Sequence, residues 1–174
     1  VATTAWGWSP WAALPLSLAV SGGAAVVLGL ITVRLSGHFL PLGTIAWGLA
    51  LYYLFGNLDV LGRHDGLSGI PPLSIAGHAL TDPRAVHWPI WTAVVLCGIA
   101  TTRLLDSRVG RAIRALRRGQ LAAEAFGIDA STTKLIVFVH AALLAGLSGW
   151  LYAHVQRTVT QTPFGLSAGI EYLF

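Results

Sequence analysis

Six arginines crowd one short polar segment between two long apolar runs, and their spacing is that of a binding surface. They are Arg103, Arg108, Arg111, Arg114, Arg117 and Arg118. From Arg108 onward they recur at three- and four-residue steps, so they share one face of a helix. Such a face can bind anionic lipid headgroups, and each arginine contributes about 1 kcal/mol to binding at an anionic membrane surface. It also offers a docking surface to a soluble partner.

The residues around these arginines predict two short helices. Val109, Ile113 and Leu116 line the opposite face of the first helix, which makes it amphipathic. Ser107 is a suitable N-cap for this helix, and Gly119 breaks it.

The second helix, residues 120–126, differs in chemistry because nearly all its side chains are small. Glu124 is its one acidic residue, and Gly127 is a suitable C-cap. A helix of this kind is a poor lipid anchor. Ala122 and Ala123 suit insertion into a groove on another protein.

A charged trio lies in a separate glycine-rich stretch, where Arg63, His64 and Asp65 precede Gly66. The trio could contact a binding protein, or the ammonium and carboxylate of a substrate. The alternative is a solvated turn, which is what glycine-rich polar runs usually form.

His140 lies inside an apolar run, as do Thr101 and Thr102 in another. An ionisable side chain within a membrane span is by default a candidate for a functional pathway. The alternative is a neutral imidazole whose N–H donates to a neighbouring backbone carbonyl.

The spacing of the remaining candidate ligands matches no metal site. His64, Asp65, His78 and His87 follow no known ligand template, and the lone Cys97 offers neither a disulfide nor a metal quartet. The chain also lacks the Gly-x-x-x-x-Gly-Lys-Ser/Thr phosphate loop. We therefore expect no cofactor in this chain.

The composition indicates whether the chain is surrounded by water or by a lipid bilayer. Hydrophobic residues make up 55% of the chain and charged residues 10%, with a mean hydropathy of +0.68. Soluble domains carry about 25% charged residues, so the bilayer is the expected solvent. The net charge of +4 comes from basic residues beside apolar runs, without base-stacking aromatics, which argues against nucleic acid.

The apolar runs predict an all-α, polytopic transmembrane helical bundle. A spanning helix needs about 20 mostly apolar residues. We expect about four spans, at residues 11–33, 38–57, 88–105 and 134–154. The span at 11–33 has a small-residue patch at 21–25, and the span at 134–154 has another at Ala142, Ala145, Gly146 and Gly149. Patches of this kind allow helices to approach closely.

Basic residues orient this bundle. If residues 106–133 form a cytoplasmic loop and the spans alternate, residues 58–87 form an outer loop. The cytoplasmic side then holds Arg34, Arg103, Arg108, Arg111, Arg114, Arg117, Arg118 and Lys134, against Arg63, Arg84 and Arg157 outside. This asymmetry agrees with the positive-inside rule. Because the chain starts at Val1 without a basic leader and ends at Phe174 as an apolar stretch begins, we expect residues 1–174 to be a fragment of one transmembrane domain.

Several motifs occur in an order that resembles one family. They read GRAIRALR at 110–117, AAEAFGI at 122–128 and AGLSGWLYA at 145–153, with Lys134-Leu135 and Phe138 between the last two. Upstream stand RLSGHF at 34–39, LGTIA at 42–46 and GLSGIP at 66–71. Over about residues 28–174 the chain closely resembles the permease subunits of branched-chain amino acid ABC importers.

The resemblance implies a multi-pass permease of the bacterial inner membrane with several partners. They would be a second permease subunit or domain, two cytoplasmic ATPases that bind ATP and Mg, and an extracytoplasmic solute-binding protein. The coupling residues that seat in an ATPase cleft would be Arg111, Arg114, Ala122, Ala123, Glu124 and Gly127. One departure is Leu121, which stands where the general importer motif has a glutamate.

The function expected from this resemblance is import of branched-chain or related amino acids. ATP-driven closure of the ATPases would pull on residues 108–127 and rock the spans between two states. Hydrolysis would occur in the partners, so the chain itself is not expected to be an enzyme. The alternatives are a permease for urea or short amides, an intramembrane enzyme using His140 with Asp65 and His64, or a membrane scaffold without a transport role.

Overall fold

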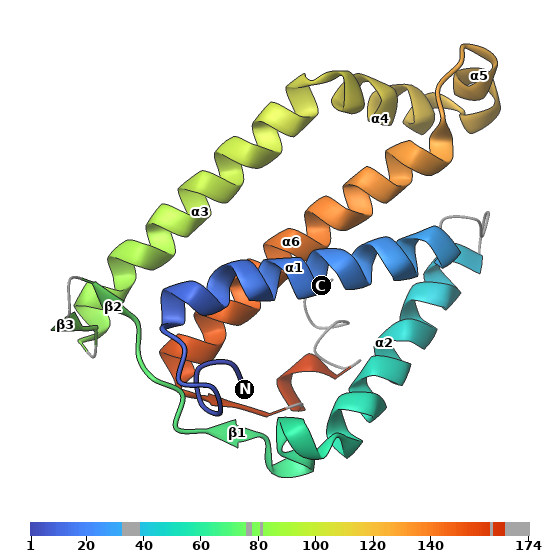
Figure 1. Ribbon diagram of the computed structural model, residues 1–174. Helices are drawn as coiled ribbons and strands as arrows, with labels where there is room; N and C mark the ends of the chain where they lie inside the picture. The colour runs from blue at the N-terminus through green and yellow to red at the C-terminus, as the bar shows by residue number, and fades with distance from the viewer. Residues whose placement is uncertain (33–38, 76–77, 81, 161, 166–174) are drawn as a thin grey trace.

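Four long helices form the body of the molecule in this computed structural model (Figure 1). The structure describes residues 1–32, 39–75, 78–80, 82–160 and 162–165. The long helices are α1 (Pro10–Thr32), α2 (Phe39–Asn57), α3 (Pro83–Asp106) and α6 (Ala130–Gln156). Two short helices, α4 (Arg108–Arg118) and α5 (Gln120–Ala125), join α3 to α6. The break expected at 34–37 lies outside the described residues.

The long helices account for the expected membrane spans. Within the described residues, α1, α3 and α6 are each long and apolar enough to cross a bilayer. Residues 42–57 of α2 form a fourth candidate only together with residues 59–65, which are bent from them by 82°. The prediction of an all-α, polytopic membrane protein is therefore confirmed.

Two helices begin earlier than their apolar runs because aspartates cap them. The side chain of Asp82 accepts a hydrogen bond from the Arg84 amide at 3.0 Å, so α3 begins at Pro83. Asp129 accepts from the amide of Thr132 at 3.1 Å and from its hydroxyl at 2.6 Å, so α6 begins at Ala130. Each cap satisfies amide donors that the first helical turn leaves without partners.

The cap of α6 makes the start of that helix sensitive to acid. The hydrogen bonds from the Thr132 hydroxyl and amide hold the pKa of Asp129 below its usual range. Because the folded pKa is depressed, the stabilisation is present above the unfolded pKa of about 4 and is lost as pH falls through the folded value. We expect the protection of the Thr132 amide, measured as its exchange rate relative to the intrinsic rate at each pH, to fall in this acid range. The Asp129→Ala variant should show low protection at every pH, and a parallel pH dependence of protection in variant and wild type would contradict the assignment.

Helices α1 and α6 pack closely against each other through small residues. A Cβ added at Gly146 would lie 2.6 Å from Ser21 Oγ, and one added at Gly22 would lie 3.2 Å from Leu143. The Ser17 hydroxyl also donates to the Gly146 carbonyl at 3.3 Å. The expectation that the two small-residue patches allow close helix approach is confirmed, and the structure pairs them with each other.

Aromatic side chains fasten one end of this helix pair. Trp150 Nε1 donates to the Pro10 carbonyl at 2.9 Å, and its ring centroid lies 5.5 Å from that of Trp11. Trp11 Nε1 donates to the Ser74 carbonyl at 2.6 Å. His154, 5% exposed, donates from Nδ1 to the Pro71 carbonyl at 2.8 Å. These bonds attach the loop after α2 to the end of α6.

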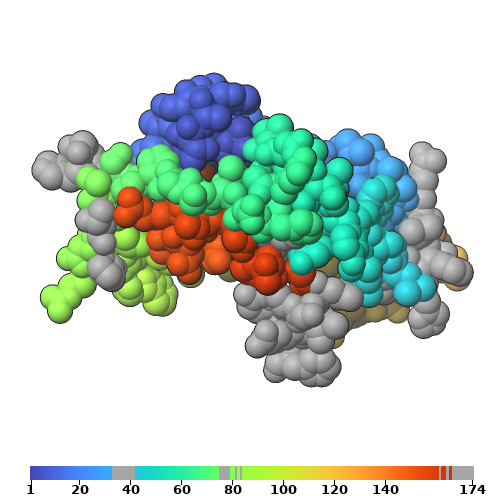
Figure 2. Space-filling model, turned by 90° about the horizontal axis from the view of Figure 1, so that it is seen from below, coloured from blue at the N-terminus to red at the C-terminus, as the bar shows by residue number. Residues whose placement is uncertain are grey.

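Short elements build the rest of this end. The 3-10 turns are η1 (Asp59–Leu61), η2 (Arg63–Asp65) and η3 (Thr162–Phe164), and the strands are β1 (Leu67–Ser68), β2 (Ser74–Ile75), β3 (His78–Ala79) and β4 (Thr158–Val159). Strand β1 pairs antiparallel with β4, and β2 with β3. The space-filling view shows the loop after α2, in green, lying along the end of α6, in orange to red (Figure 2).

Candidate functional site

The segment between α3 and α6 forms a corner built of two short helices, which we call the elbow and define as residues 107–129. It lies at one end of the molecule, away from β1 and β2 (Figure 1). Ser107 ends α3, and its side chain accepts from the Val109 amide at 3.1 Å, which confirms it as the N-cap of α4. A Cβ at Gly110 would lie 1.8 Å from the Leu105 carbonyl oxygen, so the turn into α4 requires glycine there.

The expected amphipathic character of α4 is confirmed. Its arginines are all exposed: Arg108, Arg111, Arg114, Arg117 and Arg118. The apolar residues Val109, Ile113 and Leu116 are half-buried on the other side. Arg114 Nη1 also donates to the Leu105 carbonyl at 2.9 Å, so this arginine helps to brace α4 against the end of α3.

Helix α5 exposes Ala122 and Glu124, two of the expected coupling residues, but it does not expose Ala123. Ala123 is only 4% exposed, so it packs inside the elbow. Leu121 and Phe126 are 84% and 88% exposed, and Ala122 and Glu124 are also exposed. In the sequence, Leu121 stands out only as a departure from a motif, and nothing distinguishes Phe126 as a contact residue. Two large, neighbouring apolar side chains that are exposed to solvent typically indicate a surface that binds another protein.

The C-cap of α5 is Phe126, one residue before the expected Gly127, and Gly127 is the left-handed residue that follows the cap. Gly127 adopts φ 81°, and its amide donates to the Glu124 carbonyl at 2.9 Å. The Ile128 amide donates to the Ala123 carbonyl at 3.1 Å. These two bonds form a Schellman motif, in which the left-handed residue is usually glycine. The motif sets the direction in which the chain leaves α5.

A chain of side-chain hydrogen bonds ties α5 to the start of α6. Lys134 Nζ donates to Gln120 Oε1 at 2.9 Å, and Gln120 Nε2 donates to Glu124 Oε1 at 2.8 Å. The structure thus places Glu124 in a network that positions α5, with its carboxylate still exposed.

The charged trio lies at the other end of the molecule. Arg63 pairs with Asp59, and His64 and Asp65 complete the exposed turn η2. Gly66 adopts φ 72°, and a Cβ there would lie 2.2 Å from the Val159 carbonyl oxygen, so this glycine allows the close pairing of β1 with β4.

His140 lies far from the trio and has a different partner. Its Nε2 lies 3.0 Å from Thr101 Oγ1, which links α6 to α3. His154, which contacts the outer loop, is fourteen residues further along α6, roughly 21 Å of helix. The arrangement expected of an intramembrane enzyme, with His140 beside His64 and Asp65, is therefore not assembled. Within the described part of the chain, no three His, Cys, Asp or Glu side chains come together as a metal site.

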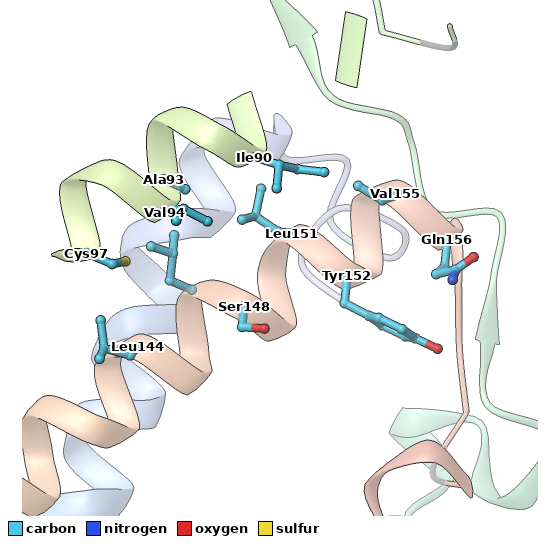
Figure 3. Close-up of a pocket in the computed structure, with 11 residues that line it drawn as sticks. Ile90, Ala93, Val94, Cys97, Leu144, Ser148, Leu151, Tyr152, Val155 and Gln156 are labelled. Carbon is cyan, nitrogen blue, oxygen red and sulfur yellow. The ribbon is translucent and has the colours of Figure 1, made fainter. Parts of the chain in front are cut away.

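Between His140 and the C-terminal end of α6, helices α3 and α6 line an open groove of about 520 Å³ (Figure 3). Its lining residues are Ile90, Ala93, Val94 and Cys97 from α3, and Leu144, Leu147, Ser148, Leu151, Tyr152, Val155 and Gln156 from α6. Leu151 points from α6 toward Ile90 on α3 (Figure 3). This groove could not be predicted from the sequence, because its two walls are distant in the chain.

Residues 1–174 match the protein family described as "Branched-chain amino acid transport system / permease component". The chain is 29% identical over 178 residues to the high-affinity branched-chain amino acid transport system permease protein LivM of Salmonella typhimurium. It is 27% identical to the protein of that name from Escherichia coli K12. Each match covers 88% of this chain and 42% of the relative, so the chain spans less than half of their length. No solved structure matches.

Proposed function

The chain belongs to the permease-component family of branched-chain amino acid transport systems, and from that premise we propose that it is part of the membrane subunit of an ABC importer. The cargo is branched-chain or related amino acids, as the names of the two LivM relatives suggest. The subunit works in the bacterial inner membrane with a second permease subunit, two ATPases that bind ATP and Mg, and an extracytoplasmic solute-binding protein.

The main support for this proposal is the structure of the elbow, which combines exposed apolar side chains with short connections between its helices. Leu121 and Phe126 project from it, while Ala123 and the Schellman motif hold α5 in shape. Only Ser107 separates α3 from α4, and only Gly119 separates α4 from α5. Residues 126–129, which join α5 to α6, are held by the Schellman motif and by the Asp129 cap. A force applied to α5 would therefore reach α3 and α6 through short, hydrogen-bonded connections, as rigid-body coupling requires.

The charge of the elbow supports a cytoplasmic position. Exposed arginines along α4 would lie beside the anionic inner leaflet. In this orientation Ala122, Glu124, Leu121 and Phe126 face the ATPase cleft. Arg111 and Arg114 support the contact from α4.

The opposite end then faces the solute-binding protein. His64 and Asp65 lie on its surface in an exposed turn, and Gly66 gives that turn its close attachment to β4. His140 remains the candidate for the pathway, because it lies between α3 and α6 rather than at either end.

The cargo is tested by uptake in cells that lack their own branched-chain amino acid transport. With the full-length protein and its partners expressed, we expect ATP-dependent uptake of labelled leucine that excess valine or isoleucine suppresses. The aliphatic lining of the α3–α6 groove favours these cargoes over urea. Suppression by urea or acetamide but not by valine would assign the chain to amide transport instead. Absence of any ATP-dependent uptake would favour the scaffold alternative.

A further inference from the structure

We propose that the arginine face of α4 binds the phosphate groups of anionic phospholipids, and that this contact holds the elbow at the membrane while the ATPase acts on α5. The face consists of Arg108, Arg111, Arg114, Arg117 and Arg118. The inference rests on the proposed function for the cytoplasmic position of the elbow. It adds to that position a binding partner for α4 and a dependence of transport on the charge of the lipid.

The exposed surface of α4 is formed by arginine alone. The structure describes this helix in full, and each of its residues outside the arginine face is half-buried or buried. The rise along the helix from Arg108 to Arg118 is about 15 Å. Guanidinium groups can bind phosphate oxygens through two parallel hydrogen bonds. Helix α4 therefore offers phosphate groups a continuous row of suitable donors.

The protein supplies no acidic partner for this row. Within the described residues, no ion pair joins an arginine of α4 to a carboxylate. Glu124 and Asp129, two acidic residues that follow in the elbow, accept hydrogen bonds from Gln120 and Thr132 instead. Asp106, at the end of α3, is exposed and forms no ion pair with the row in the described part of the chain. The positive charge is therefore left for an external anion to balance.

The connection to α3 places the row at the depth of the lipid headgroups. The apolar span Arg84–Asp106 has 23 residues, which is about 35 Å of helix against about 30 Å of hydrocarbon. A span of this length ends among the headgroups, and only Ser107 separates it from α4. Helix α4 then turns away from the direction of α3 and runs toward the start of α6 (Figure 1). Long arginine side chains on such a helix can reach lipid phosphates.

An acidic protein surface is the alternative partner, and the composition of the face argues against it. Protein interfaces usually surround their charges with large apolar or aromatic side chains, and the exposed surface of α4 has none. Helix α5 does have them, as Leu121 and Phe126. The two helices therefore offer different surfaces, α5 to the ATPase and α4 to lipid. Arg111 and Arg114 then support the ATPase contact indirectly, by holding α4 in place.

The lipids retained by the purified transporter test this binding directly. The full transporter is extracted in mild detergent from membranes of phosphatidylglycerol and phosphatidylethanolamine, and its retained lipids are quantified by mass spectrometry. Combining Arg108→Gln, Arg117→Gln and Arg118→Gln is expected to lower the ratio of phosphatidylglycerol to phosphatidylethanolamine several-fold, because each arginine contributes to binding at an anionic surface. Lysine at the same three positions keeps the charge and should keep most of the phosphatidylglycerol. An unchanged ratio in the glutamine variant would overturn the inference.

The matched control removes the same charge from the opposite end of the molecule. It combines Arg63→Gln, Arg84→Gln and Arg157→Gln. These arginines are also exposed, but they lie on separate elements and form no common face. We expect this control to retain nearly as much phosphatidylglycerol as the wild type. An equal fall in both triple variants would mean that retention follows net charge alone, and it would also overturn the inference.

Reconstitution separates lipid binding from ATPase binding. The complete transporter is placed in vesicles of phosphatidylcholine, with or without about a third of phosphatidylglycerol. We expect phosphatidylglycerol to raise ATP-dependent leucine uptake several-fold in the wild type. The glutamine variant of α4 should lose most of this increase and still copurify with the ATPases.

The remaining outcomes identify which proposal fails. Equal wild-type uptake in the two kinds of vesicle would contradict the dependence on lipid charge. A glutamine variant that keeps phosphatidylglycerol but loses the ATPases would show that the arginines bind protein, and the inference would fail. If the wild type takes up no amino acid in either vesicle, the proposed function fails, and the ratio of retained lipids still decides whether α4 binds anionic phospholipid.

Discussion

Substitution of both Leu121 and Phe126 by aspartate is expected to abolish amino acid uptake, while the permease remains in the membrane. The two side chains are the most exposed large apolar groups in the described part of the chain. Apolar side chains at the centre of an interface can each contribute about 2 kcal/mol or more to association. The double variant should therefore lose its ATPase subunits during purification in mild detergent.

The matched control places the same change at the opposite end of the molecule. Val60 is 68% exposed and lies in η1, so Val60→Asp should retain the ATPases. Ala123 is a poorer probe, because a large residue there would disturb the packing of the elbow itself. If the double variant copurifies with the ATPases and supports normal uptake, α5 is not the contact.

Alanine at Gly146 is expected to destabilise the whole bundle. Its Cβ would lie 2.8 Å from the Cβ of Ser21 as well as 2.6 Å from its hydroxyl oxygen, so rotation of the serine cannot relieve the contact. Helices α1 and α6 must then separate, and overpacking of this kind costs about 1–3 kcal/mol. The measurement is the loss of monodisperse protein on heating in detergent, followed by size-exclusion chromatography.

Gly149→Ala is the matched control, because a Cβ there meets nothing within 4 Å. It should be neutral or slightly stabilising, since alanine favours helix over glycine by about 1 kcal/mol. Adding Ser21→Gly to Gly146→Ala removes the opposing Cβ and should restore much of the stability. Equal stability of Gly146→Ala and Gly149→Ala would refute the steric account of the α1–α6 contact.

The features that could be predicted from the sequence are those encoded within a few residues. The arginine spacing predicts the amphipathic α4, and Ser107 and Gly127 mark helix ends through hydrogen bonds to their near neighbours. Apolar runs of sufficient length likewise predict the long helices. Local signals of this kind depend only on helix geometry and backbone conformation.

Contacts between distant segments could not be predicted in this way. The patches around Ser21 and Gly146 each indicate a close helix neighbour, but neither identifies the other as that neighbour. Thr101 and His140 are 39 positions apart, and only the packing of α3 beside α6 makes them partners. The exposure of Leu121 and Phe126 was also not predicted, because six residues with mostly small side chains show no clear apolar periodicity.

The central claim is that a cytoplasmic ATPase binds the elbow. The accessibility of residue 126 to a membrane-impermeant thiol reagent tests this claim most directly. Phe126→Cys is treated with a membrane-impermeant maleimide in right-side-out and inverted vesicles, each with and without the ATPase subunits, and the peptide containing residue 126 is quantified by mass spectrometry. We predict labelling only in inverted vesicles stripped of ATPase, and protection when the ATPase is added back. Labelling in right-side-out vesicles, or labelling that the ATPase leaves unchanged, would contradict the claim.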